Sequence, residues 1–255
     1  MRYLVISLFF LLAFQHCQQK SEEFQVFDLD ASHPSREVKL SDLAKDLRLV
    51  PLETTDESLL PSFFNYIIGN KYIITFTQTN ILQFDTNGKF IRTLTKQGKG
   101  PGEFEYLSSF VTDNRETRLY VSHYGSDELM VFDLASGAPL KNIATPEKAA
   151  ELIFVNEDEL LAFCYGFDKY QRYRVNVQTG VVSDTVRVTS DDTYTTNGSR
   201  STFITKVNDK IYTLFPDSDT LYQLSAKEFE PELLFRFENK VEYGISNVGR
   251  DLYFR

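Results

Sequence analysis

The 255-residue chain carries 27 basic and 36 acidic residues, which gives a formal net charge of −9 at pH 7. An acidic chain with no dense cluster of Lys or Arg is poorly suited to bind nucleic acid or an anionic membrane surface. Its hydrophobic content of 42% is ordinary for a globular domain with a sizeable core.

The first 16 residues have the pattern of a secretory signal peptide. Arg2 precedes an apolar run from Tyr3 to Phe14 that only Ser7 interrupts. Such a run fits the hydrophobic region of a signal, and it is too short for a membrane-spanning helix, which needs about 20 residues. We therefore predict a signal peptide over residues 1–16.

Cys17 follows the apolar run at once and precedes a polar segment. This placement resembles the lipidation site of a bacterial lipoprotein, in which the signal is cleaved before the cysteine and the cysteine carries acyl chains. The alternative is an ordinary cleaved signal with an incidental cysteine. The pair Glu22–Glu23 resembles the export signals of Bacteroidota lipoproteins, or it begins a solvated tether. Cys164 lies in an apolar run, so we predict a buried thiol and no disulfide.

A short hydrophobic strand behind a polar residue returns about every 45 residues along the chain. Its copies begin at Lys71, Arg118, Glu159, Lys210 and Asp251. A period of roughly 40–50 residues is typical of the four-stranded blades of a β-propeller. We therefore predict an all-β fold, with propeller blades over residues 46–255.

The predicted elements follow from alternating apolar residues bounded by turn residues. The lipid-anchored tether, residues 17–45, is expected to contain a strand at 24–29 and a helical turn at 41–45. The first two repeats give strands at 63–68, 72–77, 81–84, 90–95, 107–113, 118–123, 128–134 and 139–144. The next two give strands at 150–155, 160–164, 172–177, 181–188, 202–207, 211–215, 221–224 and 233–237.

A fifth unit opens at Val241 and stops inside its second strand at Arg255. Ring closure removes exposed sheet edges in a propeller, so a ring that ends inside a blade stays open. We predict about four full blades plus partial blades of a six-bladed type, with the N-terminal strand completing the last blade and about one further blade absent. We expect a chain truncated at its C-terminus, which aggregates or purifies poorly alone.

Two stretches carry a family resemblance. The run Phe84–Leu94, followed by Gly98–Phe104, resembles the NHL-type repeat and, more closely, the six-bladed β-propeller lipoproteins of Bacteroidota. The segment Leu49–Thr54 also resembles that family. The resemblance implies a propeller and a place in the cell envelope, as an outer membrane lipoprotein on its periplasmic or cell-surface face. It implies no settled activity.

The sequence lacks the patterns of a catalytic, cofactor or metal centre. Gly98–Glu103 lacks the ending of a phosphate-binding loop, and Pro101 removes a backbone donor, so a turn between blades is the better interpretation. After the signal only His33 and His123 remain, too few for a three-histidine zinc site. No serine-nucleophile elbow is present. We predict no cofactor and no metal.

Four residues remain as site candidates. His123 ends the 118–123 strand beside Tyr124 and could face the central channel or a loop, which makes both residues candidate ligand contacts. Thr185 and Thr220 each stand between an Asp and an aliphatic residue, which resembles the acceptor of Bacteroidota O-glycosylation. A chance match is the alternative for both threonines.

The function expected from these features is a lipid-anchored cell-envelope propeller that binds an envelope protein or glycan without catalysis. Its membrane contact is the anchor at Cys17, and nucleic acid is not a partner. The alternative is a propeller enzyme, a lyase or hydrolase that acts on a sugar or peptide at the central channel. Clustered carboxylates or histidines near Asn65–Asn70 or His123 would favour the enzyme, whereas apolar and hydroxyl residues would favour binding.

Overall fold

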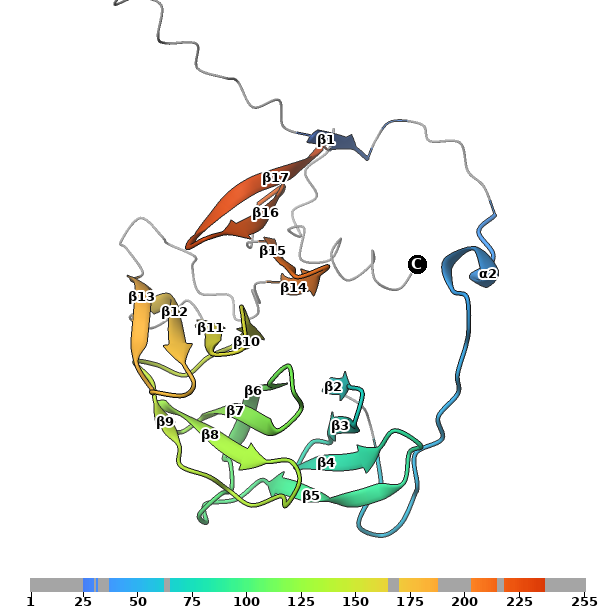
Figure 1. Ribbon diagram of the computed structural model, residues 1–255, viewed down its shortest axis with the longest axis vertical. Coiled ribbons are helices and arrows are strands. Elements are labelled where there is room, and N and C mark those ends of the chain that lie inside the picture. Colours follow the sequence, from blue (N-terminus) through green and yellow to red (C-terminus); the bar gives the residue numbers. More distant parts are fainter. Residues whose placement is uncertain are drawn as a thin grey trace, which may run out of the picture.

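The computed structural model describes residues 25–29, 31, 37–61, 65–164, 170–187, 203–214 and 218–236. Within these ranges the strands form three four-stranded sheets and one five-stranded sheet. The sheets follow one another around an arc, each with its first strand toward the middle and its last strand outside (Figure 1). This arrangement of blades confirms the predicted β-propeller fold.

Each blade is built from four strands that are consecutive in the chain and antiparallel to their neighbours. The first blade contains β2 (Asn65–Ile68), β3 (Tyr72–Phe76), β4 (Asn80–Asp85) and β5 (Phe90–Lys96). The second contains β6 (Tyr106–Thr112), β7 (Arg118–Tyr124), β8 (Glu128–Asp133) and β9 (Ile143–Ala144). The third contains β10 (Glu151–Phe154), β11 (Glu159–Phe163), β12 (Tyr170–Asn176) and β13 (Val182–Arg187). The fourth contains β14 (Phe203–Val207), β15 (Lys210–Leu214), β16 (Thr220–Ser225) and β17 (Glu228–Arg236).

Most strands lie within two residues of the predicted bounds, and two strands differ by more. The strand expected at 139–144 pairs only at Ile143–Ala144, with an isolated bridge between Pro139 and Phe132. Proline has no N–H for a ladder, so it shortens an outer strand. In contrast, β17 begins several residues early, because a register shift near Leu221 accommodates Pro231 within the ladder.

The predicted N-terminal strand, β1 (Gln25–Asp28), does not complete a later blade as expected, but joins the fourth blade as its fifth and outermost strand. It runs parallel to β17, with Gln25 beside Leu233 and Asp28 beside Arg236. The rings of Phe27 and Phe235 meet edge to face with 6.4 Å between their centroids. The short helix α2 (Leu40–Leu43) follows on the side of the arc between the first and fourth blades (Figure 1). No helix in the described ranges is both long and apolar enough to cross a membrane.

The segment that precedes the first blade seals one face of it. Val50, Leu52 and Leu60 pack against a buried cluster of the first blade, made of Ile73, Leu82 and Phe84. The segment also binds the β4–β5 turn, where the backbone N–H of Glu53 donates to the carbonyl oxygen of Gly88 at 2.8 Å. The segment thus covers apolar surface that would otherwise face water.

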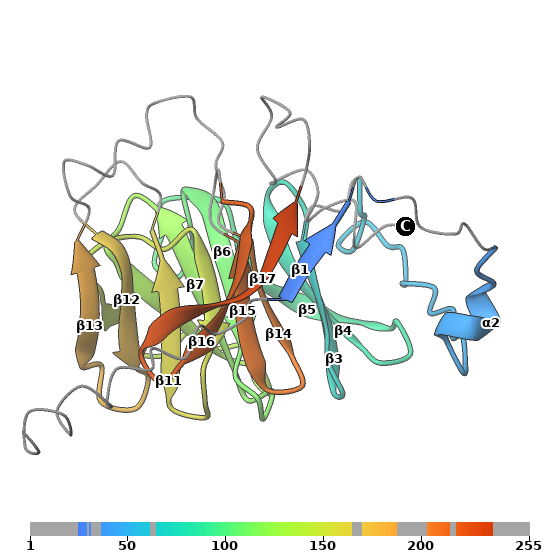
Figure 2. The same ribbon diagram turned by 90° about the horizontal axis from the view of Figure 1, so that it is seen from above.

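The core lies between blades, because successive residues of each strand pack against opposite neighbours. On β7, Leu119 and Val121 belong to the cluster shared with the first blade. Tyr120, between them, belongs to the cluster shared with the third blade. The strands stand side by side, and their turns gather on two opposite faces of the molecule (Figure 2).

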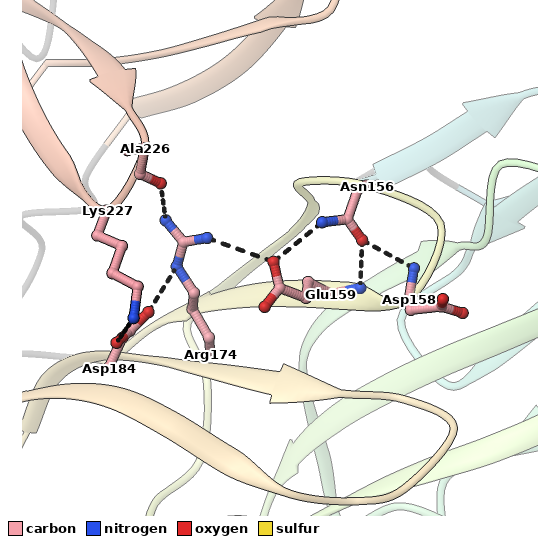
Figure 3. Close-up of polar contacts among 7 residues, drawn as sticks. All are labelled: Asn156, Asp158, Glu159, Arg174, Asp184, Ala226 and Lys227. Atoms are coloured by element: carbon pink, nitrogen blue, oxygen red, sulfur yellow. Dashed lines mark hydrogen bonds and ion pairs between the residues drawn. The ribbon is translucent and has the colours of Figure 1, made fainter.

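Buried polar side chains tie a blade to the turn of the next blade. In the first blade, Gln83 Nε2 on β4 donates to the carbonyl oxygen of Leu134 in the second blade at 2.9 Å. In the third, Arg174 Nη2 on β12 donates to the carbonyl oxygen of Ala226 in the fourth at 2.7 Å (Figure 3). Both donors lie on the third strand of a blade, and both acceptors follow the third strand of the next.

The guanidinium of Arg174 also joins two carboxylates. Its Nη1 lies 3.5 Å from Glu159 Oε2, and its Nε lies 3.5 Å from Asp184 Oδ2 (Figure 3). Asp184 in turn accepts a bond of 2.9 Å from Lys227 Nζ of the fourth blade. Only 6% of the Arg174 side chain is exposed, whereas Glu159 and Asp184 are 36% and 26% exposed, so the network joins the blades through a buried cation and partly exposed carboxylates.

Candidate functional site

One row of side chains on β7 runs along the seam between the second and third blades. Because strand residues alternate, every second residue from Arg118 to Tyr124 points toward the third blade. Tyr120 packs its ring against Phe154 of β10, with 5.4 Å between the centroids. Ser122 Oγ accepts the backbone N–H of Ala149 at 2.9 Å. Two candidate binding surfaces, described below, lie at the Arg118 end and at the Tyr124 end of this row.

A hollow of about 250 Å³ opens at the Arg118 end of the seam. The β6–β7, β10–β11 and β12–β13 turns form its walls. Its lining is polar throughout and consists of Asp113, Asn114, Arg115, Thr117, Arg118, Glu157, Asp158 and Gln178.

The β6–β7 turn is held rigidly, which fixes one wall of the hollow. Asp113 accepts the backbone N–H of Thr117 at 2.6 Å and its hydroxyl at 2.5 Å. The carboxylate of Glu116, a residue with φ of 51°, accepts the backbone N–H groups of Asn70 and Lys71 at 2.6 and 2.7 Å. Burial opposes the ionisation of Glu116, but these backbone hydrogen bonds outweigh it and lower its pKa.

A buried phenol, that of Tyr120, lies beside one lining residue of the hollow, Arg118. Tyr120 is 1% exposed, and burial raises the pKa of its hydroxyl above the usual value. A hydrogen bond with the Arg118 side chain works in the opposite direction, and the charges of Asp113 and Asp158 add to the rise. The hydroxyl is therefore a neutral group beside the lining residues, fixed in place by the core.

The rim of the hollow joins two blades through an ion pair. The guanidinium of Arg115 on the second blade contacts the carboxylate of Glu157 on the third. Both side chains are largely exposed, at 70% and 62%, so this pair contributes little to stability. Its position leaves both charged groups accessible to a ligand.

The opposite end of the seam carries the exposed Tyr106 together with the half-buried Tyr124 and Lys148. Tyr106 is 65% exposed and lies directly opposite Tyr124 in the ladder. Lys148 Nζ lies 5.8 Å from the centroid of the Tyr124 ring, a cation–π distance. We refer to these three residues as the tyrosine–lysine surface.

The connector that carries Lys148 is anchored on both sides. Ser108 Oγ donates to the carbonyl oxygen of Ala149 at 2.7 Å, and Tyr173 Oη donates to that of Glu147 at 2.6 Å. Together with the bond from Ala149 to Ser122, these contacts fix the backbone on each side of Lys148. The tyrosine–lysine surface is therefore preorganised.

His123 and Tyr124 lie on opposite sides of the second blade and do not form one site. His123 shares the side of Val121, toward the first blade, and is only 7% exposed. Its Nδ1 lies 2.9 Å from the carbonyl oxygen of Tyr124. Because a carbonyl only accepts, Nδ1 carries the proton in this contact. Tyr124 remains a candidate ligand contact within the tyrosine–lysine surface.

The other predicted site residues are spread over the molecule. Thr185 is exposed on β13, directly after Asp184 of the Arg174 network. Thr220 is half-buried at the start of β16, and its hydroxyl donates to Asp219 at 3.2 Å. Cys164 follows β11 and packs against the core between the second and third blades. Cys17 lies outside the described residues.

The inner strands β2, β6, β10 and β14 carry mainly apolar and hydroxyl residues. Their one carboxylate is Glu151, which lies opposite Phe163 in the ladder. Burial raises the pKa of Glu151 to about 7. In the described part of the chain, no group of three or more His, Cys, Asp and Glu side chains could hold a metal ion.

Sequence reasoning identified Tyr124 but not its partners or the hollow. The alternation of residues 118–124 would have placed Arg118 and Tyr124 on one side of a strand. No local signal connects Arg118 with Asp158 or Gln178, which come from turns of the next blade. Those contacts depend on how blades stack.

Comparisons with known proteins agree with the fold. Residues 24–252 match the family described as Domain of unknown function (DUF4934). A Bacteroides fragilis protein described as exported superposes with a TM-score of 0.62 at 20% identity, over 76% of this chain and 56% of that one. A DUF4221 family member from Bacteroides vulgatus superposes with a TM-score of 0.52 at 12% identity, over 76% and 63%. The chain thus spans less than two thirds of either structure. No curated protein matches it.

Proposed function

The chain belongs to the DUF4934 family, and we propose that it is a lipid-anchored cell-envelope propeller that binds a protein or glycan without catalysis. The tyrosine–lysine surface carries this proposal. Tyrosine rings offer an apolar face and a polar tip at a small entropy cost, and lysine adds a charged donor. Because the backbone that carries Lys148 is fixed before a ligand arrives, little backbone ordering opposes binding.

The placement in the envelope rests on the N-terminus. We propose a signal peptide over residues 1–16, a tether anchored at Cys17 over residues 17–45, and blades over residues 46–255. The fold relative from Bacteroides fragilis, which is described as exported, supports an extracytoplasmic location. An outer membrane lipoprotein with NHL-like repeats, on the periplasmic or cell-surface side, is the specific form that we propose.

The anchor is tested by metabolic labelling with an alkyne fatty acid. The full-length chain should incorporate the label in a bacterial host, and Cys17→Ser should not. Equal labelling of both chains would exclude Cys17 as the acylated residue. Absence of labelling in both would remove the anchor from the proposal and leave the binding surface to be tested by itself.

The binding surface is tested with the full-length chain extracted in mild detergent and applied to an array of bacterial glycans and envelope proteins. Tyr106→Ala should weaken binding about tenfold or more, as expected for a central aromatic contact. Tyr66→Ala is the matched control, because Tyr66 is 60% exposed on the first blade, away from the seam. No binding to any probe, or equal loss in both variants, would overturn the proposal.

One observation favours the enzyme as a second candidate. Glu151 is an inner-strand carboxyl with a pKa of about 7, a value suited to a general acid near neutral pH. Glycoside hydrolysis usually needs two carboxylates that flank the bond, whereas Glu151 is the one carboxylate on the four inner strands. Turnover of an array glycan that is lost in Glu151→Gln would favour the enzyme over the binding module.

A further inference from the structure

We propose that the hollow between the second and third blades is a second binding site, one that takes a single uncharged sugar unit. It lies at the other end of β7 from the tyrosine–lysine surface, about 20 Å away for a seven-residue strand. The site is therefore separate from the function proposed above, and it stands even if the tyrosine–lysine surface binds nothing.

The size of the hollow limits the ligand. Its volume of about 250 Å³ is below the roughly 300–1,000 Å³ of sites that enclose drug-sized molecules. It offers room for one sugar ring, and a longer glycan would extend into solvent past the exposed rim of Arg115 and Glu157.

The charges of the lining are mixed and favour no strongly charged ion. Three carboxylates, those of Asp113, Glu157 and Asp158, stand beside the guanidinium groups of Arg115 and Arg118, so an ion of either sign meets like charge as well as opposite charge. A neutral molecule rich in hydroxyl groups avoids both penalties. Each hydroxyl group both donates and accepts hydrogen bonds, so it can use the carboxylates as acceptors and the guanidinium groups as donors.

The lining also offers the planar polar groups that recognise hydroxyl groups in pairs. The amides of Asn114 and Gln178 are exposed and face the hollow from different blades. Each amide can donate and accept side by side, as neighbouring hydroxyl groups on a sugar ring require.

The walls are rigid, so the site exists before a ligand arrives. Asp113 closes the β6–β7 turn through Thr117, and Glu116 fastens the same turn to the first blade. On the third blade, the backbone N–H of Val177 donates to the carbonyl oxygen of Asp158 at 2.8 Å, which joins the other two turns of the hollow. A weak ligand gains from this preorganisation because few side chains must be ordered.

The test is equilibrium binding of the full-length chain to neutral monosaccharides, with glucuronic acid and glucosamine as the anionic and cationic comparisons. At least one neutral sugar should bind more tightly than either charged one. The double variant Asn114→Ala/Gln178→Ala should weaken that binding about tenfold, the loss expected for two neutral hydrogen-bonding groups. Asn142→Ala is the matched control, because Asn142 is an exposed amide on the second blade outside the hollow.

Several outcomes would overturn the site. The inference is wrong if no neutral sugar binds, or if a charged sugar binds more tightly. It is also wrong if Asn142→Ala weakens binding as much as the double variant does. Loss of the same binding in Tyr106→Ala, with the double variant unaffected, would assign the sugar to the tyrosine–lysine surface instead. Melting curves of the variants check that each remains folded.

Discussion

Arg174 on β12 reaches across the blade boundary and donates to the carbonyl oxygen of Ala226 at 2.7 Å. The bond occupies the same place in the repeat as the bond from Gln83 to Leu134 two blades earlier. A strand position that faces the next blade thus carries a polar donor aimed at a backbone acceptor. The propeller combines apolar packing with directional contacts that set how one blade registers on the next.

Replacing Arg174 with Met should lower the free energy of unfolding by about 2–4 kcal/mol. The change leaves the carboxylates of Glu159 and Asp184 without their buried cation and removes the donor to Ala226. Chemical denaturation measures the loss. Arg115→Met is the control, because its 70% exposed side chain should contribute less than about 1 kcal/mol. Similar losses in Arg174→Met and Arg115→Met would contradict a stabilising role for Arg174 between the third and fourth blades.

Glu151 should make the fold less stable as pH rises. Its pKa is about 7 in the folded chain against an ordinary 4.5, so the folded state binds the proton more tightly than the unfolded state. The contribution of Glu151 to stability is then fully present below pH 4.5 and falls as pH rises toward and past 7, by up to about 3 kcal/mol. Glu151→Gln should remove this fall, measured by denaturation from pH 5 to 8, whereas the exposed Glu57→Gln should follow the parent chain. Parallel curves for Glu151→Gln and the parent would refute the assignment.

Glu116 should show the opposite dependence on pH. Its pKa is lowered, so its contribution to stability is present above 4.5 and is lost as pH falls through the lowered value. Glu116→Gln should cost about 1–3 kcal/mol at pH 7, because the backbone donors of Asn70 and Lys71 lose a charged acceptor. The difference in the free energy of unfolding between Glu116→Gln and the parent chain should disappear at acidic pH. Glu157→Gln, at an exposed carboxylate, should show neither effect.

Gly88→Ala should detach the segment that seals the first blade. The φ of Gly88 is 86°, and a Cβ there would lie 2.1 Å from the carbonyl oxygen of Pro51. Gly180 has a φ of 73°, and a Cβ there would meet Ile143 Cγ2 at an ordinary 3.8 Å, so Gly180→Ala measures mainly the conformational strain, about 1 kcal/mol. Gly88→Ala should cost clearly more and expose residues 48–60 to limited proteolysis. Equal losses of stability in Gly88→Ala and Gly180→Ala would show that the segment can move away from the added Cβ at no cost in free energy.

If either threonine carries a glycan, Thr185 is the residue that we expect to carry it. Thr185 is exposed on an outer strand, whereas Thr220 is half-buried and donates to Asp219. Intact mass of the chain from its native host should fall to that of the bare polypeptide in Thr185→Ala and stay unchanged in Thr220→Ala. A parent chain without added mass would exclude both sites.

The sequence was sufficient to place the blades because a short hydrophobic strand returns about every 45 residues, and three of the four blades end their third strand in a turn that contains glycine. The Asn-Gly pair at 87–88 takes up a positive φ at Gly88, as a tight hairpin requires. Local signals were insufficient where proline alters a ladder. Pro139 shortens β9, whereas Pro231 is absorbed by a shift in register, and no local rule separates these two outcomes.

The candidate sites were less predictable because their residues meet across blades. Glu116 accepts backbone N–H groups from a turn 45 residues earlier, which neither its own sequence neighbours nor its charge indicates. His123 and Tyr124 are adjacent in the chain, yet alternation along β7 sends them to opposite sides. The fold thus separates His123 from Tyr124, and it brings Glu116 to a turn that is distant in the sequence.

The parallel pairing of β1 with β17 has a mechanical consequence. A force applied to the chain before Gln25 reaches the propeller through the backbone pairs of β1 at the outer edge of the fourth blade. The first structure to yield would be this one peripheral strand, while the packed seams between blades stay unstressed. Detachment of β1 would thus relieve the tension on the N-terminal segment before it reached the surfaces that we propose bind ligands.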